Sequence, residues 1–278
     1  MELKNKIENK TAVTAIVGMG YVGLPHAAEI AGAGMEVIGL DVQEKRVAML
    51  NHGESYISDV SKDALEKIIA AGKFKASADF SLLARADVII ICVPTPLDKY
   101  KIPDISYITA AADEVKKYLR RGQLVILEST TYPGTTEEVL LPLFAETGLK
   151  CGKDFYLAFA PERIDPGNKM PLAEIPKVVG GITPECTALA ATFYSQFLKH
   201  IHSVSSAKAA EMTKILENVY RLINISAINE LAMLCGRMGL DIWEVIDAAK
   251  TKPYGFQAFY PSPRVGGHCI PLDPFYLS

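Results

Sequence analysis

The sequence has little of what marks several protein classes. Its five cysteines are odd in number, widely spaced and without a CxxC pair, which argues against both a disulfide framework and a zinc site. No apolar run approaches the roughly 18 residues that cross a bilayer, and the first ten residues lack the apolar core of a signal peptide. A net charge of -3 gives no excess of basic residues that would favour binding to nucleic acid or to an anionic membrane. We therefore expect small-molecule partners, no metal, no nucleic acid, no membrane and a cytoplasmic location.

What the chain does have is the composition of a globular protein. Of its 278 residues, 49% are hydrophobic and 22% charged, enough for two domains or one large one. Continuously apolar runs alternate with helical stretches, which is typical of a parallel sheet buried on both faces. The expected strands are 12–17, 35–40, 87–93 and 124–127, with shorter ones at 155–159 and 177–179, and the clearest helices are 61–71 and 106–119. The predicted fold is α/β, a Rossmann-type doubly wound parallel sheet.

A different pattern begins at Ser206. One long helix is expected from there to about Gly236, and a shorter one after Gly239, near residues 241–250. We therefore divide the chain into a Rossmann-type domain, residues 1–203, and a helical central domain built on one long helix, residues 204–278.

The first expected strand runs into Gly18-Met19-Gly20-Tyr21-Val22-Gly23 and then into an Ala-rich helix. In such a unit the first glycine permits a tight turn, the second admits a pyrophosphate and the third allows close packing of the helix. Asp41 lies 23 residues after Gly18, at the end of the next strand, where a carboxylate binds ribose hydroxyls and repels a 2′-phosphate. The pattern predicts NAD rather than NADP as cofactor. The alternative is that Asp41 merely caps the following helix.

Near the C-terminus, the segment 266–274 holds Cys269 between paired glycines and two prolines. This is a poor setting for a packing cysteine and indicates a nucleophile on a rigid loop. A free thiol has a pKa near 8.5, so only about 3% is thiolate at pH 7. Cys269 therefore needs a cationic neighbour from elsewhere in the chain.

Six motifs together cover nearly the whole chain: Gly18 to Gly23, Val93-Pro94-Thr95-Pro96, Glu128-Ser129-Thr130, Pro161-Glu162-Arg163, Glu211 to Arg221 and Gly266 to Pro274. In this order they resemble the UDP-glucose/GDP-mannose dehydrogenase family, whose members oxidise a sugar CH2OH to a carboxylate with two NAD+ and no metal. Segments 161–168 and 248–253 resemble the branch that acts on UDP-N-acetylhexosamines, particularly UDP-N-acetylglucosamine 6-dehydrogenases. The resemblance implies an NAD-dependent, four-electron oxidation at C6 of a UDP-sugar.

The resemblance also implies catalytic roles. Cys269 would form a thiohemiacetal and then a thioester, while Lys214 and Asn218, spaced i, i+4 on one helical face, would form the oxyanion site. Glu162 would transfer a proton or activate water, Asp273 would orient Lys214 or the hydrolytic water, and Thr130 would order water near the nicotinamide. Without the cysteine loop, we would interpret Lys214 and Asn218 as part of a solvated helix face. For Glu162, Asp273 and Thr130, each taken alone, the alternative is a turn residue or a cap.

Binding roles follow in the same way. The residues implied to bind the cofactor are Gly18, Gly20, Tyr21, Val22, Gly23, Asp41, Arg46, Pro94, Thr95 and Thr130. Those implied to bind the substrate are Glu162, Arg163, Lys214, Asn218, Arg221, Arg264 and Gly266. An arginine on the helix surface is an equally good interpretation of Arg46. His268 is expected to brace its loop, because its side chain and that of the adjacent Cys269 should point apart.

Two departures from the family pattern bear on specificity. Pro166 stands where the glucose-oxidising branch usually carries a second glutamate, which weakens a UDP-glucose assignment. The family's Pro-Gly-Pro-Gly before the cysteine is replaced by Pro261-Ser262-Pro263-Arg264, so Arg264 either binds a phosphate or sugar oxygen or stiffens the loop.

Relatives in this family continue beyond the cysteine loop into a domain that holds the UDP moiety, so we expect this chain to be part of a longer protein. The long helix would form a homodimer, or else a monomer core, through apolar positions such as Met212, Leu216, Val219, Leu222, Ile223 and Leu231. Three alternatives stay open: a UDP-glucose 6-dehydrogenase, a two-electron β-hydroxyacid-type dehydrogenase with no need for Cys269, and a non-catalytic NAD-binding or dimerisation module.

Overall fold

The computed structural model describes residues 2–100, 102–164, 170–263 and 272–277. It divides into two compact units. Unit 1 comprises Met1–Asp98 and Pro103–Lys214, and unit 2 comprises Lys99–Ile102 and Ile215–Ser278.

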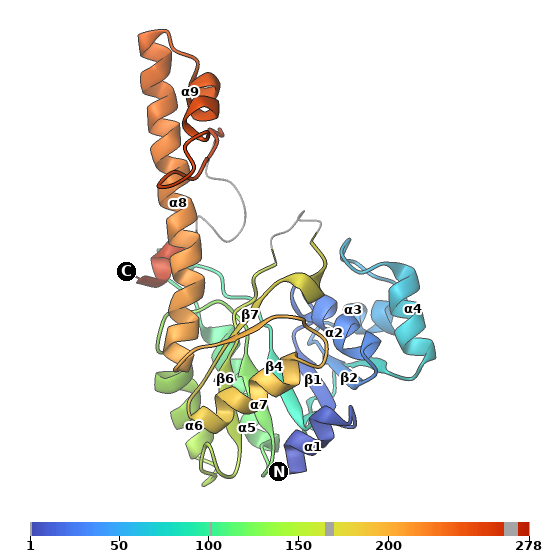
Figure 1. Ribbon diagram of the computed structural model, residues 1–278. Helices are drawn as coiled ribbons and strands as arrows, with labels where there is room; N and C mark the ends of the chain where they lie inside the picture. Colours follow the sequence, from blue (N-terminus) through green and yellow to red (C-terminus); the bar gives the residue numbers. More distant parts are fainter. Residues whose placement is uncertain (1, 101, 165–169, 264–271, 278) are drawn as a thin grey trace. The chain divides into compact units, whose positions relative to one another are not determined.

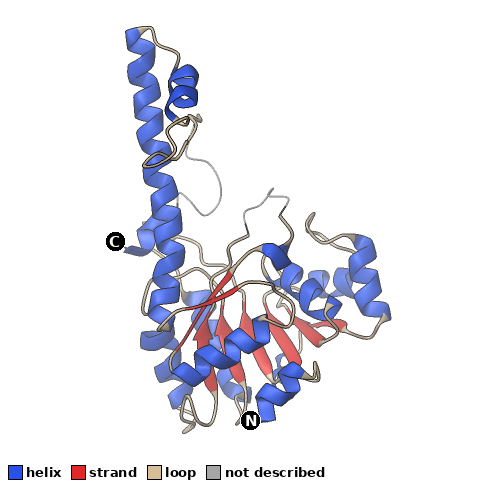
Figure 2. Ribbon diagram, in the orientation of Figure 1, coloured by secondary structure: helices blue, strands red, loops and turns tan. Residues whose placement is uncertain are grey.

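Unit 1 is built on an eight-stranded sheet, drawn red in Figure 2, in the order β3-β2-β1-β4-β5-β6-β7-β8. Its strands are β1 (Val13–Val17), β2 (Glu36–Leu40), β3 (Phe74–Ser77), β4 (Val88–Ile91), β5 (Leu124–Leu127), β6 (Tyr156–Phe159), β7 (Lys177–Gly181) and β8 (Ile201–Ser203). All neighbours from β3 to β6 are parallel, and the order 3-2-1-4-5-6 is that of a doubly wound dinucleotide-binding sheet. The predicted fold class is confirmed.

Helices cover both faces of this sheet (Figure 1). One buried core gathers apolar side chains of α1 (Glu2–Glu8), α2 (Gly23–Gly32), α4 (Lys62–Ala70) and α7 (Pro184–Tyr194). The other core gathers those of α5 (Ser106–Tyr118), α6 (Leu141–Ala145) and the start of α8 (Ala207–Met238). Strand β1 serves both, because Ile16 packs into the first core and Ala15 and Val17 into the second. The remaining elements of unit 1 are α3 (Glu44–Asn51), η1 (Phe80–Arg85), η2 (Thr136–Leu140) and η3 (Leu172–Glu174).

One strand departs from the parallel arrangement of the sheet. Strand β7 pairs antiparallel to β6, with Ala158 opposite Gly181. A parallel pair needs a crossover connection, usually a helix, and in the described part of the 160–176 connection the only helical element is the three-residue η3. The chain therefore returns along β6 in the opposite direction, which places the start of β7 near the carboxyl end of β6.

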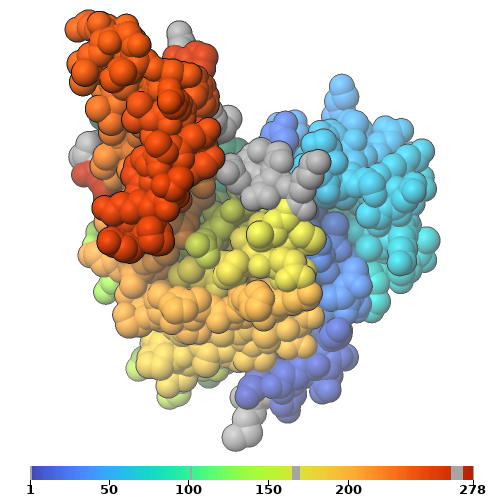
Figure 3. All heavy atoms as spheres, turned by 45° about the horizontal axis from the view of Figure 1, so that its top comes forward, coloured from blue at the N-terminus to red at the C-terminus, as the bar shows by residue number. Residues whose placement is uncertain are grey.

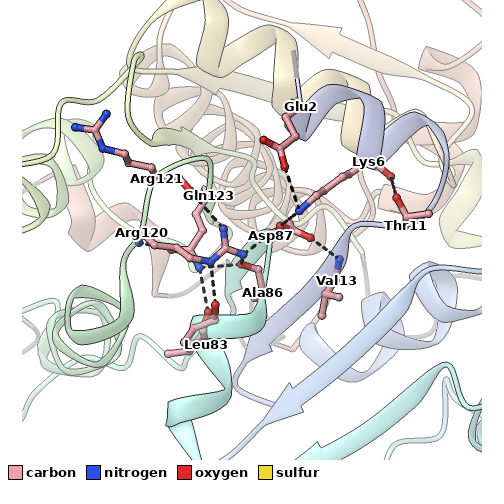
Figure 4. Close-up of polar contacts among 11 residues, drawn as sticks. Glu2, Lys6, Thr11, Val13, Leu83, Ala86, Asp87, Arg120, Arg121 and Gln123 are labelled. Atoms are coloured by element: carbon pink, nitrogen blue, oxygen red, sulfur yellow. Dashed lines mark hydrogen bonds and ion pairs between the residues drawn. The ribbon is translucent and has the colours of Figure 1, made fainter.

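Asp87, just before β4, ties the N-terminal helix to the sheet (Figure 4). Its Oδ1 lies 3.0 Å from Lys6 Nζ and 3.1 Å from Arg120 Nη2, and its Oδ2 accepts the backbone N–H of Val13 at 3.2 Å. Burial opposes this charge, but the hydrogen bonds from Lys6 and Arg120 outweigh it and hold the pKa of Asp87 below its usual value. One carboxylate thus joins α1, β1 and the segment before β5.

Unit 2 contains most of α8, with α9 (Ile242–Ala249) and η4 (Asp273–Leu277). Helix α8 ends before Gly239, whose φ of +71° suits glycine, and Asp241 caps α9 by accepting the backbone N–H of Trp243 at 2.9 Å. Trp243 stacks on Tyr260 at 5.7 Å between ring centroids. Among the described residues, no helix is both long and apolar enough to span a membrane.

Candidate active site

The turn between β1 and α2 has room for a ligand at one of its three glycines. Gly18 has φ +97°, and a Cβ there would lie 2.6 Å from the Cys92 carbonyl oxygen. A Cβ on Gly23 would lie 1.9 Å from the Gly18 carbonyl oxygen, whereas one on Gly20 would meet nothing within 4 Å. The protein's own packing therefore requires Gly18 and Gly23, and the open space at Gly20 fits the close approach of a dinucleotide pyrophosphate.

Asp41 follows β2 and is hydrogen-bonded to the glycine turn. Its Oδ2 accepts the Met19 backbone N–H at 3.1 Å, and its Oδ1 accepts that of Gln43 at 2.9 Å. It does not cap α3, because the N-cap residue of that helix is Gln43. A carboxylate offers about four acceptor positions, so Oδ1 can still accept a bond from a ribose hydroxyl.

Two further groups surround Asp41. Arg46 Nη1 lies 3.5 Å from Asp41 Oδ2, and the Arg46 guanidinium lies over the Tyr56 ring at 5.4 Å. The Tyr56 hydroxyl donates to the Met19 carbonyl oxygen at 2.5 Å. Burial and the Asp41 carboxylate raise the pKa of Tyr56 to about 12, so it stays a neutral donor. Sequence reasoning missed Tyr56, because a tyrosine in a loop has no spacing signal.

The other residues expected to bind the cofactor follow the parallel strands at their carboxyl ends. Tyr21 and Pro94 are exposed, and Thr95 and Thr130 are partly exposed. Ser129 Oγ donates to the Val93 carbonyl oxygen at 2.8 Å, which joins the segments after β4 and β5. This is the edge where doubly wound sheets bind ligands, but contact of these residues with a cofactor stays a prediction.

Glu162, in the loop after β6, is held by four donors. Its Oε1 accepts the backbone N–H groups of Arg163 at 2.6 Å and Ile164 at 2.5 Å. Its Oε2 lies 3.0 Å from His26 Nε2 and 3.1 Å from Lys177 Nζ. A carboxylate has about four acceptor positions, and these four contacts use all of them.

Lys177 connects Glu162 to a second buried carboxylate. Its Nζ lies 3.0 Å from Glu128 Oε1, and the Tyr194 hydroxyl donates to the same oxygen. The thiol of Cys92 lies 3.4 Å from Glu128 Oε2. We call His26, Cys92, Glu128, Glu162, Lys177 and Tyr194 the buried polar cluster, because all six are buried. In Figure 3 the segment that carries α7, yellow to light orange, lies on the surface of the face shown, whereas Lys177 and Tyr194 are buried.

Burial and charge act against each other in this cluster. Burial disfavours the charges of Lys177 and Glu162, but their opposite partners outweigh it, so the pKa of Lys177 is raised and that of Glu162 is lowered well below its usual value. Burial, reinforced by Glu128, raises the pKa values of Cys92 and Tyr194 well above their usual range. Glu162 is therefore a fixed anion. To take up a proton, as predicted for catalysis, it would first have to lose a donor.

The cluster does not fit a metal ion. Ligand atoms of His26, Glu128 and Glu162 lie within 4.8 Å of one another, a spacing that a cation could bridge. The Lys177 ammonium already lies among them, at 3.0 Å and 3.1 Å from the two carboxylates and 3.4 Å from His26 Nε2. A second cation there would be repelled by the first.

In unit 2, the structure brings together two residues expected to be catalytic. Asn218 Nδ2 donates to Asp273 Oδ2, and both side chains are buried. Lys214, the last residue of unit 1, and Arg221 of unit 2 lie on α8 and are partly exposed. The orienting of Lys214 by Asp273 stays a prediction.

Of the remaining predicted residues, two have assigned partners and three lie outside the described residues. Val22 is partly exposed, and its carbonyl oxygen lies 3.0 Å from His26 Nδ1. Arg163 donates from Nη1 to the Pro176 carbonyl oxygen at 2.8 Å. Arg264, Gly266 and Cys269, with His268, lie outside the described residues.

Sequence reasoning missed His26 and Lys177 and used Glu128 only as part of a motif. The sequence signal that could have found these residues is a titratable side chain in, or directly after, an otherwise apolar strand or helix. Lys177 begins a strand that is buried throughout, and Glu128 follows a strand that is buried throughout. His26 lies among buried residues of α2. Charged residues are almost never fully buried unless paired, so such positions predict partners, although not which ones.

The sheet order, the glycine turn and Asp41 define a dinucleotide-binding fold of the dehydrogenase class. Residues 12–198 match the NAD binding domain of the UDP-glucose/GDP-mannose dehydrogenase family, and residues 208–278 match its central domain. The chain belongs to this family, as the motifs predicted, and the predicted cofactor, NAD, is confirmed by the match to the NAD binding domain.

Relatives and solved structures agree with this assignment. The chain is 40% identical over 272 residues to a UDP-N-acetyl-D-glucosamine 6-dehydrogenase of Pseudomonas aeruginosa, covering 97% of this chain and 63% of that protein. The structure of a UDP-D-ManNAc dehydrogenase from Pyrococcus horikoshii matches with a TM-score of 0.90 and 37% identity, over 95% of this chain and 63% of that one. The chain thus spans less than two thirds of the length of these relatives.

More distant structures share the fold. A UDP-glucose dehydrogenase from Pyrobaculum islandicum matches with a TM-score of 0.81 and 26% identity, over 96% of this chain and 63% of that one. A 3-hydroxyisobutyrate dehydrogenase from Mycobacterium tuberculosis matches with a TM-score of 0.63 and 20% identity, over 87% of this chain and 71% of that one. At that identity the likeness shows the fold alone.

Proposed function

We propose that this protein carries out the NAD-dependent, four-electron oxidation of the C6 hydroxymethyl group of a UDP-N-acetylhexosamine, with UDP-N-acetylglucosamine as the first candidate, to the uronic acid. The observation that carries the proposal is the cofactor edge, where Asp41 is hydrogen-bonded to a turn that is open at Gly20. The printed activities of the two relatives at 37–40% identity support the substrate class.

Bound NAD+ supplies the hydride acceptor for each oxidation. Between the two oxidations, the Cys269 sulfur forms a bond to the aldehyde carbon, and the carbonyl electron pair moves to oxygen. Lys214 and Asn218 stabilise the negative charge on that oxygen, each well-aimed donor contributing about 3 kcal/mol. The second oxidation gives a thioester, and water then adds, breaks the C–S bond and returns the thiol.

Asp273 has a definite task in this scheme. It accepts one hydrogen of the Asn218 amide, which fixes the orientation of that amide and leaves its second N–H for the oxyanion. Thr130 orders water, and Glu162 provides the fixed negative charge beside the sugar. Residues 1–203 act as the NAD-binding domain and residues 204–278 as the central domain.

We further propose that α8 joins two copies of the chain in a homodimer. Support comes from large apolar side chains that this helix exposes in the single chain: Met212, Leu216, Ile223, Leu231, Met233, Leu234 and Met238. A cytoplasmic location stays a prediction.

The test measures NADH and sugar acid with UDP-N-acetylglucosamine, UDP-N-acetylmannosamine and UDP-glucose. It uses the 278-residue chain and a version lengthened with the remaining segment of a relative. We expect two NADH per carboxylate in the lengthened version. One NADH per substrate, with a carbonyl product, would favour a two-electron dehydrogenase instead. NAD+ binding with no oxidation of any sugar by either version would favour a non-catalytic module.

A further inference from the structure

The proposed reaction uses only Glu162 of the buried polar cluster and gives no role to His26. It lies in the first turn of α2, directly after the glycine turn, and it is fully buried. Its imidazole connects this helix with the loop that carries Glu162. Both regions are needed in the proposed function, so the charge state of this ring bears on the cofactor site.

Both ring nitrogens face acceptors. Nδ1 lies 3.0 Å from the Val22 carbonyl oxygen, and a carbonyl oxygen can only accept. Nε2 lies 3.0 Å from Glu162 Oε2, and this carboxylate, held by two backbone N–H groups and by Lys177, is ionised. Lys177 Nζ, a donor, also lies 3.4 Å from Nε2, but the Glu162 oxygen is nearer to this nitrogen. Two acceptors require two N–H groups, and only the imidazolium form of histidine has both.

The charge balance agrees with this reading. Glu128 and Glu162 carry two negative charges, and Lys177 carries one positive charge. With a neutral His26 the buried polar cluster would hold one uncompensated negative charge, which is costly in a protein interior. With an imidazolium the cluster is neutral.

We propose that His26 is a buried imidazolium that acts as a positioning residue, fixing the glycine turn and the Glu162 loop to each other. Its ring holds the Val22 carbonyl on one side and the Glu162 carboxylate on the other. Its positive charge also lies behind the N-terminus of α2, which faces the cofactor phosphates in this fold. Loss of the proton would leave a net negative charge behind a site for an anionic diphosphate.

The groups that surround His26 set the direction of its pH response. Burial disfavours the charged ring and Lys177 repels it, but Glu128 at the end of β5 and Glu162 after β6 outweigh them and raise its pKa above the usual value. Cys92 and Tyr194, the other titratable members, are neutral. A group with a raised pKa stabilises the fold fully below its unfolded value of about 6.5, and this contribution is lost as pH rises through the folded value. Both the stability of the fold and the affinity for the cofactor should therefore fall as the pH rises through the folded-state pKa of His26.

The first measurement is nitrogen NMR of the 278-residue chain labelled with 15N-histidine. We expect His26 to show two protonated ring nitrogens at pH 6.5 and to lose one of these protons only at a higher pH. The signals of His26 are those that disappear in His26→Gln. The control is His202→Gln, at an exposed position on β8, and loss of the same signals in this variant would mean that they are wrongly assigned. A neutral His26 ring at pH 6.5, with a proton on Nδ1 alone, would overturn the proposal.

The second measurement is the dissociation constant of NAD+ as a function of pH. In the unsubstituted chain it should rise about fivefold across the His26 titration, the lower end of typical coupling between sites. In His26→Gln it should stay within about twofold, while His202→Gln should follow the unsubstituted chain. The same fivefold rise in His26→Gln would overturn the positioning role.

The inference rests on the proposed function only through its cofactor, and the two can fail separately. If the chain does not bind NAD+ at any pH, the proposed function fails while NMR still decides the charge of His26. If His26→Gln does not fold, the titration of the unsubstituted chain decides the proposal.

Discussion

Replacing Lys177 by methionine should destabilise the protein strongly. Met keeps much of the side-chain volume but removes the ammonium that lies 3.0 Å from Glu128 and 3.1 Å from Glu162. The buried polar cluster would then hold two carboxylates against one imidazolium. Breaking a buried ion pair by removing one partner costs about 3–5 kcal/mol, which corresponds to a fall in melting temperature of roughly 6–20 °C for a domain of this size.

The assay has to separate the two units. Hydrogen exchange read by mass spectrometry does so, because peptides covering β5, β6 and β7 report on unit 1, whereas Trp243, the single tryptophan, reports on unit 2 by fluorescence. We expect faster exchange in the unit 1 peptides. The control is Lys199→Met, which removes an exposed ion pair with Glu174 and should cost less than about 1 kcal/mol.

A double variant makes the test sharper. In Lys177→Met the cluster has a net charge of -1, and adding Glu128→Gln returns it to zero. The double variant should therefore be more stable than the single one, although it carries more changes. A loss below about 1 kcal/mol for Lys177→Met, or a double variant that is less stable than the single one, would refute the charge-balance reasoning.

Three further predictions follow from other parts of the chain. In a lengthened version, Cys269→Ser should keep NAD+ affinity but release no carboxylate, because no thioester can form, and normal sugar-acid output would exclude covalent catalysis. The 278-residue chain should bind NAD+, sediment as a dimer and produce no NADH from UDP-sugars, and rapid UDP-sugar-dependent NADH formation by this chain would contradict the account. The Leu216→Glu variant should shift the chain from dimer to monomer. The lowered pKa of Asp87 contributes stability at neutral pH that is lost as the pH falls through the folded-state pKa of this residue. Asp87→Asn should therefore make the melting temperature less dependent on pH on the acid side, and an unchanged dependence on pH would argue against this role.

Much of the fold could be predicted because its signals are local. Apolar runs marked β1, β2, β4 and β5 within one or two residues at either end, and the long helix expected from Ser206 is α8, Ala207–Met238. Strand β3 was missed because its burial alternates and its four residues, Phe74–Ser77, include an exposed lysine. The direction of β7 depends on a non-local pairing with β6, which no residue pattern within β7 encodes.

Part of the candidate site could also be predicted from local sequence signals, and part could not. The roles of Gly18 and Gly23 could be predicted because backbone geometry dictates them. The buried polar cluster could not, because its members come from positions 26 to 194 and meet only after the sheet has formed. The full engagement of Glu162 by four donors likewise depends on residues far apart in the sequence. The motif around Glu162 predicted a place in the site but not the fixed ionic state.

Titration calorimetry of the 278-residue chain with NAD+ and with NADP+ tests the central claim most directly, because it measures the cofactor site on which the proposed oxidation depends. Asp41 should accept the ribose hydroxyls and repel a 2′-phosphate, so NAD+ should bind at least about tenfold more tightly, a difference of about 1.4 kcal/mol. Asp41→Ala should reduce that preference, since it also frees Arg46, now 3.5 Å from the carboxylate, to pair with a 2′-phosphate. Equal affinity for the two cofactors in the unsubstituted chain, or no binding of either, would contradict the account.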